Sequence, residues 1–117
     1  MRIHRADRNS PKGWYEGPWN SDLELSLGFA NEGIHEPHLH TRITEIYLIA
    51  CGASRMRVER REIDLAKGDV IIIEPGEAHT FTQCSPDYLH FVIHSPGLSG
   101  DAAAADKVLV DLSRLGL

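Results

Sequence analysis

Apolar and polar side chains alternate strictly between residues 23 and 29. Leucines at 23, 25 and 27 and Phe29 fall on one face, and Glu24, Ser26 and Gly28 fall on the other. This two-residue period is typical of a half-buried β-strand. We therefore expect a strand that turns its leucines toward a core.

Short strand-like segments recur along the rest of the chain and are separated by turn residues such as Gly52, Lys67-Gly68-Asp69, Pro75-Gly76 and Ser85-Pro86-Asp87. Regular alternation of short strands with turns is typical of a β-sandwich or barrel. The expected segments are 38–40, 45–50, 54–59, 62–65, 70–73, 79–82 and 88–93. The pattern predicts an all-β fold with a barrel core over 23–94.

The two ends of the chain lack this pattern. Residues 1–20 have no clean period and contain the aromatics Trp14, Tyr15 and Trp19 among prolines and glycines, which predicts an irregular N-terminal arm with apolar anchors. Residues 95–117 are expected to form a C-terminal tail in which 108–115 is a helix or an added strand. The pattern leaves these two alternatives open.

Length and charge narrow the classes of function. A chain of 117 residues is long enough for one core, so we expect a single domain spanning 1–117. The net charge of −5 argues against nucleic acid as a partner. No run approaches the ~20 apolar residues of a membrane span, and Met1–Asn9 shows no signal peptide, so we expect a cytoplasmic protein with no membrane partner and free thiols at Cys51 and Cys84.

His38 and His40 are the first candidates for chemistry. Two residues apart on a strand, they point to the same face with backbones roughly 6.5 Å apart. That spacing lets both imidazoles reach one metal ion at about 2.0–2.1 Å. Taken alone, the pair fits two polar surface residues equally well.

Glu45 and His79 extend the candidate site. Glu45 shares its face of the next strand with Tyr47 and Ile49, which indicates an interior position, and a buried carboxylate is costly unless it is paired or bound to a cation. The turn at Pro75-Gly76 brings His79 to the start of a strand. Singly, His79 would be read as an ordinary core or surface histidine.

Two segments carry a family resemblance. His38-Leu39-His40-Thr41-Arg42-Ile43-Thr44-Glu45, followed after six intervening residues by Gly52, resembles the first signature of the cupins, and Gly68-Asp69 through Pro75-Gly76-Glu77-Ala78-His79 resembles the second. Glu74 stands where the second signature usually has proline, Gln83 replaces a common asparagine, and Gly33 is displaced by one residue. These departures concern loops.

The resemblance implies a double-stranded β-helix, or jelly-roll barrel, and a divalent metal held by His38, His40, Glu45 and His79. Three imidazoles and one carboxylate suit iron, manganese, nickel, zinc, cobalt or copper, and octahedral geometry leaves two positions open. By face parity, Tyr47 and His90 are the expected catalytic acid or base near the metal.

Three functions remain open at this stage. The first is a metalloenzyme of the dioxygenase, sugar isomerase or epimerase, lyase or decarboxylase type that acts on a small polar molecule. The second is a non-catalytic binder of a sugar or carboxylate, and the third is a barrel that the metal only stabilises. Because residues 46–50 are apolar on both faces, we also expect a homodimer.

Overall fold

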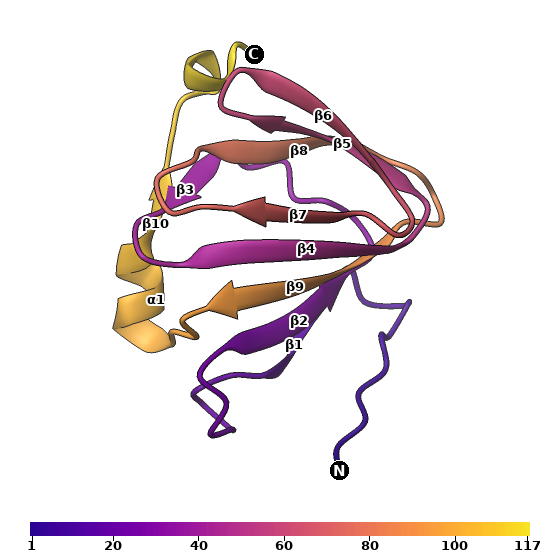
Figure 1. Ribbon diagram of the computed structural model, residues 1–117, viewed down its shortest axis with the longest axis vertical. Coiled ribbons are helices and arrows are strands. Elements are labelled where there is room, and N and C mark those ends of the chain that lie inside the picture. The colour runs from indigo at the N-terminus through magenta and orange to yellow at the C-terminus, as the bar shows by residue number, and fades with distance from the viewer.

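The computed structural model describes residues 1–117 as two five-stranded antiparallel sheets packed face to face (Figure 1). Strand order in the first sheet is β1-β2-β9-β4-β7, and in the second it is β10-β3-β8-β5-β6. The predicted all-β fold is confirmed. No helix is long and apolar enough to span a membrane.

The first sheet combines strands from both halves of the chain. Its members are β1 (Lys12–Glu16), β2 (Ser26–Ala30), β9 (Leu89–Ser95), β4 (Thr44–Cys51) and β7 (Val70–Ile73). The central strand β9 pairs with β2 on one side and with β4 on the other. Residues in register across these pairs share a face, so Glu45 lies directly opposite His94.

The second sheet brings the C-terminal segment next to the histidine pair. Its members are β10 (Lys107–Leu109), β3 (His38–His40), β8 (His79–Cys84), β5 (Ala53–Val58) and β6 (Arg61–Ala66). Strand β3 is only three residues long. It pairs with β10 along its whole length, but its only partner on β8 is His79, opposite His38.

The core fills one end of the space between the sheets. Inward-pointing residues of the strands from β4 to β9, with Tyr88 just before β9, pack as one buried cluster: Tyr47, Ile49, Met56, Leu65, Ile73, Phe81, Tyr88 and Val92. Met56 and Tyr88 are fully buried. This apolar packing holds apart the strand ends that carry the polar site.

Two expectations about the N-terminal third need correction. Residues 12–16 of the expected irregular arm form β1, which pairs with β2 through a bulge. Strand β2 begins at Ser26 rather than residue 23, and Leu23 is 39% exposed. The leucine face was assigned to the wrong side at Leu27, which lies opposite Ile93 on the outer face, whereas Ser26 lines the interior cavity. Phe29, of the same predicted face, is buried and lines that cavity.

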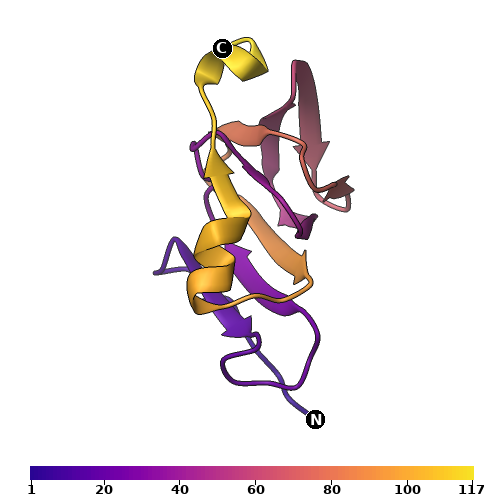
Figure 2. The ribbon, with the colours of Figure 1, turned by 90° about the vertical axis from the view of Figure 1, so that its left-hand side faces the viewer.

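The C-terminal tail contains both a helix and a strand. The α1 helix (Gly100–Asp106) leads directly into β10, and a 3-10 helix spans Leu112–Leu115. Figure 2 shows α1 and β10 running along one side of the molecule. An added strand therefore forms at 107–109, and the helical turn comes after it.

Candidate metal centre

Three strands from two sheets bring the four predicted ligand residues together. His38 and His40 lie on β3, Glu45 near the start of β4, and His79 at the start of β8. The imidazole centroid of His38 lies 5.2 Å from that of His40 and 4.4 Å from that of His79. All four residues are at most 6% exposed.

The turn before β8 fixes His79 relative to β3. Gly76 has a φ of 88°, a conformation that side chains disfavour, and its N–H donates to the carbonyl of His40 at 2.8 Å. This hydrogen bond ties the turn to the strand that carries the other two histidines.

Hydrogen bonds set the tautomer of each imidazole. Nδ1 of His38 lies 2.6 Å from the carbonyl oxygen of Glu36, and Nδ1 of His79 lies 3.0 Å from that of Glu77. A carbonyl only accepts, so each Nδ1 carries a proton, and each ring points its Nε2 away from its backbone partner. Such a bond is the usual way of orienting a metal-binding imidazole.

Glu45 lies where these Nε2 atoms converge. Its Oε1 is 2.9 Å from Nε2 of His79, and its Oε2 is 3.3 Å from Nε2 of His40. Nε2 of His40 is buried and has no hydrogen-bond partner. Bare lone pairs facing a carboxylate repel one another unless a cation lies between them, so the four side chains fit a divalent metal ion.

The surroundings favour a neutral ring at His38 and a charged carboxylate at Glu45. Burial, together with the neighbouring His79, lowers the pKa of His38 to about 4, so its ring is neutral at pH 7. Burial acts to raise the pKa of Glu45, but the neighbouring His40, His79 and His94 keep it well below its usual value. A charged carboxylate beside a neutral imidazole is the state that binds metal.

His94 joins this cluster although it was not among the predicted ligands. Its Nε2 contacts Oε2 of Glu45, so His40, Glu45 and His94 form a second candidate metal triad beside that of His38, Glu45 and His79. The signal for it was present in the sequence, since His94 shares its strand face with His90. Without the β4–β9 register, that parity did not place it against Glu45.

Asp106 is a second residue that the sequence pattern did not reveal. Its buried carboxylate lies 3.0 Å from Nδ1 of His40 and is the hydrogen-bond acceptor for that ring. Burial acts to raise its pKa, but hydrogen bonds from Arg42 N–H, His40 and Thr41 lower it. No periodicity or motif connects residue 106 with residue 40.

Tyr47 and His90 lie next to the cluster on the interior face. The Tyr47 hydroxyl donates to Oε1 of Glu45, and burial raises its pKa well above 10, so it is a proton donor at neutral pH. The ring centroid of His90 lies 4.8 Å from that of Tyr47, and Nδ1 of His90 lies 2.7 Å from the Tyr88 hydroxyl. Burial lowers the pKa of His90 to about 4, which makes it a neutral imidazole.

The cluster opens into the largest cavity of the barrel, about 850 Å³. His90, Tyr47 and all four predicted ligand residues line it, together with Trp14, Trp19 and four residues at and near the C-terminal helix: Leu98, Ser99, Gly100 and Ala103. Glu45 is its only acidic lining residue, and Lys12 and Lys107 are its only lysines. A volume of this size is ordinary for a small-molecule site.

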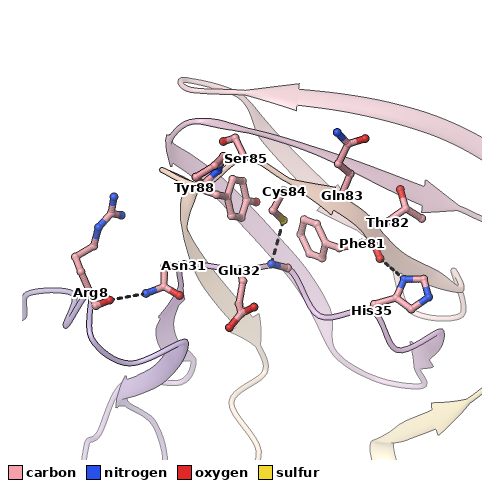
Figure 3. Close-up of a pocket in the computed structure, with 12 residues that line it drawn as sticks. Arg8, Asn31, Glu32, His35, Phe81, Thr82, Gln83, Cys84, Ser85 and Tyr88 are labelled. Atoms are coloured by element: carbon pink, nitrogen blue, oxygen red, sulfur yellow. Dashed lines mark hydrogen bonds between the residues drawn. The ribbon is translucent and has the colours of Figure 1, made fainter.

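A second cavity of about 550 Å³ lies between the 31–35 loop and β8 (Figure 3). Nδ1 of His35 lies 2.9 Å from the carbonyl oxygen of Phe81, and the N–H of Gly33 donates to Sγ of Cys84 at 3.1 Å. The candidate metal triads lie elsewhere, and Phe81 lines both cavities.

Comparison with known families decides the classification. The profile of the cupin domain matches residues 28–94, which is more than half of the chain and includes both histidine-bearing segments. The chain belongs to the cupin family. None of the curated proteins matches this cupin in sequence.

Solved structures with low sequence identity share the fold of this cupin. A conserved protein with a double-stranded β-helix domain from Klebsiella pneumoniae is 16% identical, with a TM-score of 0.68 over 95% of this chain and 98% of that chain. KdgF from Halomonas is 21% identical, with a TM-score of 0.64 over 81% and 90% of the respective chains. PAC13 of Streptomyces, bound to uridine, is 13% identical, with a TM-score of 0.65 over 86% of each chain. The predicted double-stranded β-helix is thus confirmed.

Proposed function

We propose that this cupin is a metal-dependent enzyme that catalyses proton transfer on a small polar molecule, in a reaction of the isomerase, epimerase or lyase type. One observation carries the proposal: the Nε2 atoms of three imidazoles and one carboxylate converge in a cavity that also holds a neutral imidazole and a hydroxyl donor. The metal would be held by His38, His40, Glu45 and His79.

Two residues of the chain are candidates for the proton-transfer steps, one as base and one as proton donor. The bound metal would supply Lewis acidity toward a substrate oxygen. His90, neutral at pH 7, is the candidate base, and the Tyr88 hydroxyl beside its Nδ1 fixes the ring. Tyr47 holds its proton and is the candidate donor. A neutral base and a hydroxyl donor that line the same cavity suit proton transfer.

The cavity mouth favours a ligand with an anionic group and a ring. Lys12 and Lys107 line it and no acid other than Glu45 does, although the whole chain carries a net charge of −5. Lys107 pairs with Glu36 at the surface, and a surface ion pair of this kind is weak enough for an anionic ligand to take the place of Glu36. The Trp14 and Trp19 rings meet edge to face and are each 48% exposed, which leaves apolar surface for a ligand ring.

Solvent deuterium exchange tests the proposed reaction. Metal-loaded protein in D2O is incubated with ketoses, 2-keto acids and nucleosides including uridine, the ligand of the Streptomyces relative. We expect NMR to show deuterium at a carbon of at least one compound, loss of exchange in His90→Gln, and retention in His35→Gln, whose ring lies at the second cavity. Binding without exchange for every compound would establish a binder instead, and oxygen consumption would establish an oxygenase.

The partner of the outer sheet face is a second copy of the chain. Two rows of apolar residues in cross-strand register cover this face: Leu27, Ile93, Ile46 and Ile72 in one row, and Phe91, Leu48 and Val70 in the other. Ile72 and Val70 are 55% and 56% exposed. A continuous apolar face of this kind is typical of a subunit interface, and an isologous homodimer would bury both copies at once.

A further inference from the structure

The C-terminal segment reaches the candidate metal centre through a single buried carboxylate. Asp106 is 2% exposed and accepts three hydrogen bonds: from Nδ1 of His40 at 3.0 Å, from Oγ1 of Thr41 at 3.1 Å, and from the N–H of Arg42 at 2.6 Å. Its own carbonyl accepts from the N–H of Thr41 at 3.0 Å. All four of these hydrogen bonds are with the segment that carries His40.

The same segment supplies the main strand partner of the two histidines. In the β10–β3 ladder, Lys107 lies opposite His40 and Leu109 opposite His38. On its other side, β3 meets β8 only at His38. A three-residue strand with one cross-strand neighbour on one side depends on its other edge for its position.

Residues of this segment also form part of the cavity wall. Ser99, Gly100, Ala103 and Lys107 line the cavity that contains the histidines. Figure 2 shows α1 and β10 as one continuous strap along the side of the barrel. At its C-terminal end this strap pairs with β3, the strand that carries His38 and His40, and before that it lines the cavity.

We propose that Asp106 is a positioning residue for the metal, and that docking of residues 98–109 and metal binding stabilise each other. The inference rests on the proposed metal site. A carboxylate that accepts from the Nδ1–H of a metal-binding imidazole fixes the ring's tautomer and orientation and increases its basicity, and such partners change metal affinity by about 10–100-fold. By linkage, a metal that binds better to the docked strap must also hold the strap in place.

Cobalt affinity tests the positioning role. The dissociation constant for Co²⁺ is measured by optical titration for the native chain, Asp106→Asn and Asp101→Asn, the last being a matched control on the exposed part of the same helix. We expect about 10–100-fold weaker binding for Asp106→Asn and no change for Asp101→Asn. Equal affinity for Asp106→Asn and the native chain overturns the proposal. Absence of Co²⁺ binding by the native chain overturns the metal site itself, so the two failures are distinguishable.

Further readouts separate positioning from a general structural role. In the zinc-loaded protein, the His40 Nδ1–H proton should give a low-field NMR signal that moves upfield in Asp106→Asn, which mere loosening of the tail does not produce. Thr41→Val removes one hydrogen bond to the carboxylate but leaves the contact with His40, so its Co²⁺ affinity should fall less than that of Asp106→Asn. Should Asp106→Asn fail to fold, a Thr41→Val protein with unchanged affinity and unchanged His40 signal would overturn the proposal.

Hydrogen exchange tests the coupling. Zn²⁺ should slow amide exchange in the peptide covering 98–109 of the native chain, and should slow it less in Asp106→Asn. An exchange rate in 98–109 that Zn²⁺ leaves unchanged, in a protein that binds Zn²⁺, would contradict the coupling.

Discussion

Nε2 of His79 lies 2.9 Å from Oε1 of Glu45, while Nδ1 of the same ring donates to the carbonyl oxygen of Glu77. A neutral imidazole with its proton on Nδ1 turns a lone pair toward that carboxylate. Two electron-rich atoms at this distance need a cation between them, either a proton or a metal ion. The central question for this cupin is which of the two occupies that position.

Removing the Tyr47 hydroxyl should separate metal binding from chemistry. Tyr47→Phe loses the donor to Glu45 but keeps the ring that packs against Phe81 and His90. We expect metal content to stay unchanged and deuterium exchange to fall by about 10²-fold, a typical contribution of a proton donor. Loss of the metal from Tyr47→Phe would show instead that the hydroxyl supports the ligand cluster.

The ligand prediction concerns charge at the cavity mouth. Salicylate and salicylamide share a ring and a hydroxyl and differ in negative charge. Tryptophan fluorescence should show tighter binding of salicylate by metal-loaded protein, and Lys12→Ala with Lys107→Ala should reduce the difference between the two compounds by about tenfold. Equal affinities in the native protein would remove the case for an anionic ligand.

Trp14 should contribute apolar contact rather than charge. Trp14→Ala removes a ring that lies edge to face against both Trp19 and His94. We expect weaker binding of both compounds by about 2–10-fold, the scale of one aromatic contact. If Trp14→Ala weakened the binding of salicylate and left that of salicylamide unchanged, Trp14 would act through the charge of its neighbours and not through apolar contact.

Acid should destabilise the metal-free protein partly through His90. Burial holds its pKa at about 4, below the 6.5 of an unfolded chain, so between pH 6.5 and 4 the unfolded state binds more protons and stability falls as pH falls. The free energy of unfolding, measured in urea at pH 7.5 and 4.5 with chelator present, should fall less in His90→Gln than in the native chain. The difference should be on the order of 2–3 kcal/mol. Identical losses would mean that His90 titrates normally in the fold.

The homodimer prediction concerns the outer sheet face. Ile72→Lys places a charge in the apolar rows on β7, and Leu109→Lys is the matched control at an equally exposed strand position on β10. Sedimentation at micromolar concentration should show a dimer for the native chain and the control, and a monomer for Ile72→Lys. A native monomer would contradict the prediction.

The barrel could be predicted from the repeat of strands and turns, and the four candidate ligands from two local spacings that together resemble the cupin signatures. Two residues of separation put His38 and His40 on one face, and the Pro75-Gly76 turn places His79 at a strand start. Asp106 could not be predicted as part of the site, since only the tertiary fold brings it to His40. The leucine alternation after residue 22 predicted a strand, but its leucine face was expected to turn toward the core, because an apolar outer face and a core face give the same alternation.

Metal content tests the central claim most directly. Protein purified without chelating resin is analysed by mass spectrometry for transition metals, alongside His38→Ala with His79→Ala and a control that carries His4→Ala with His35→Ala. We predict about one transition metal ion per chain in the native and control proteins and none in the His38, His79 variant. Unchanged metal occupancy in that variant would contradict the assignment of the metal to these residues.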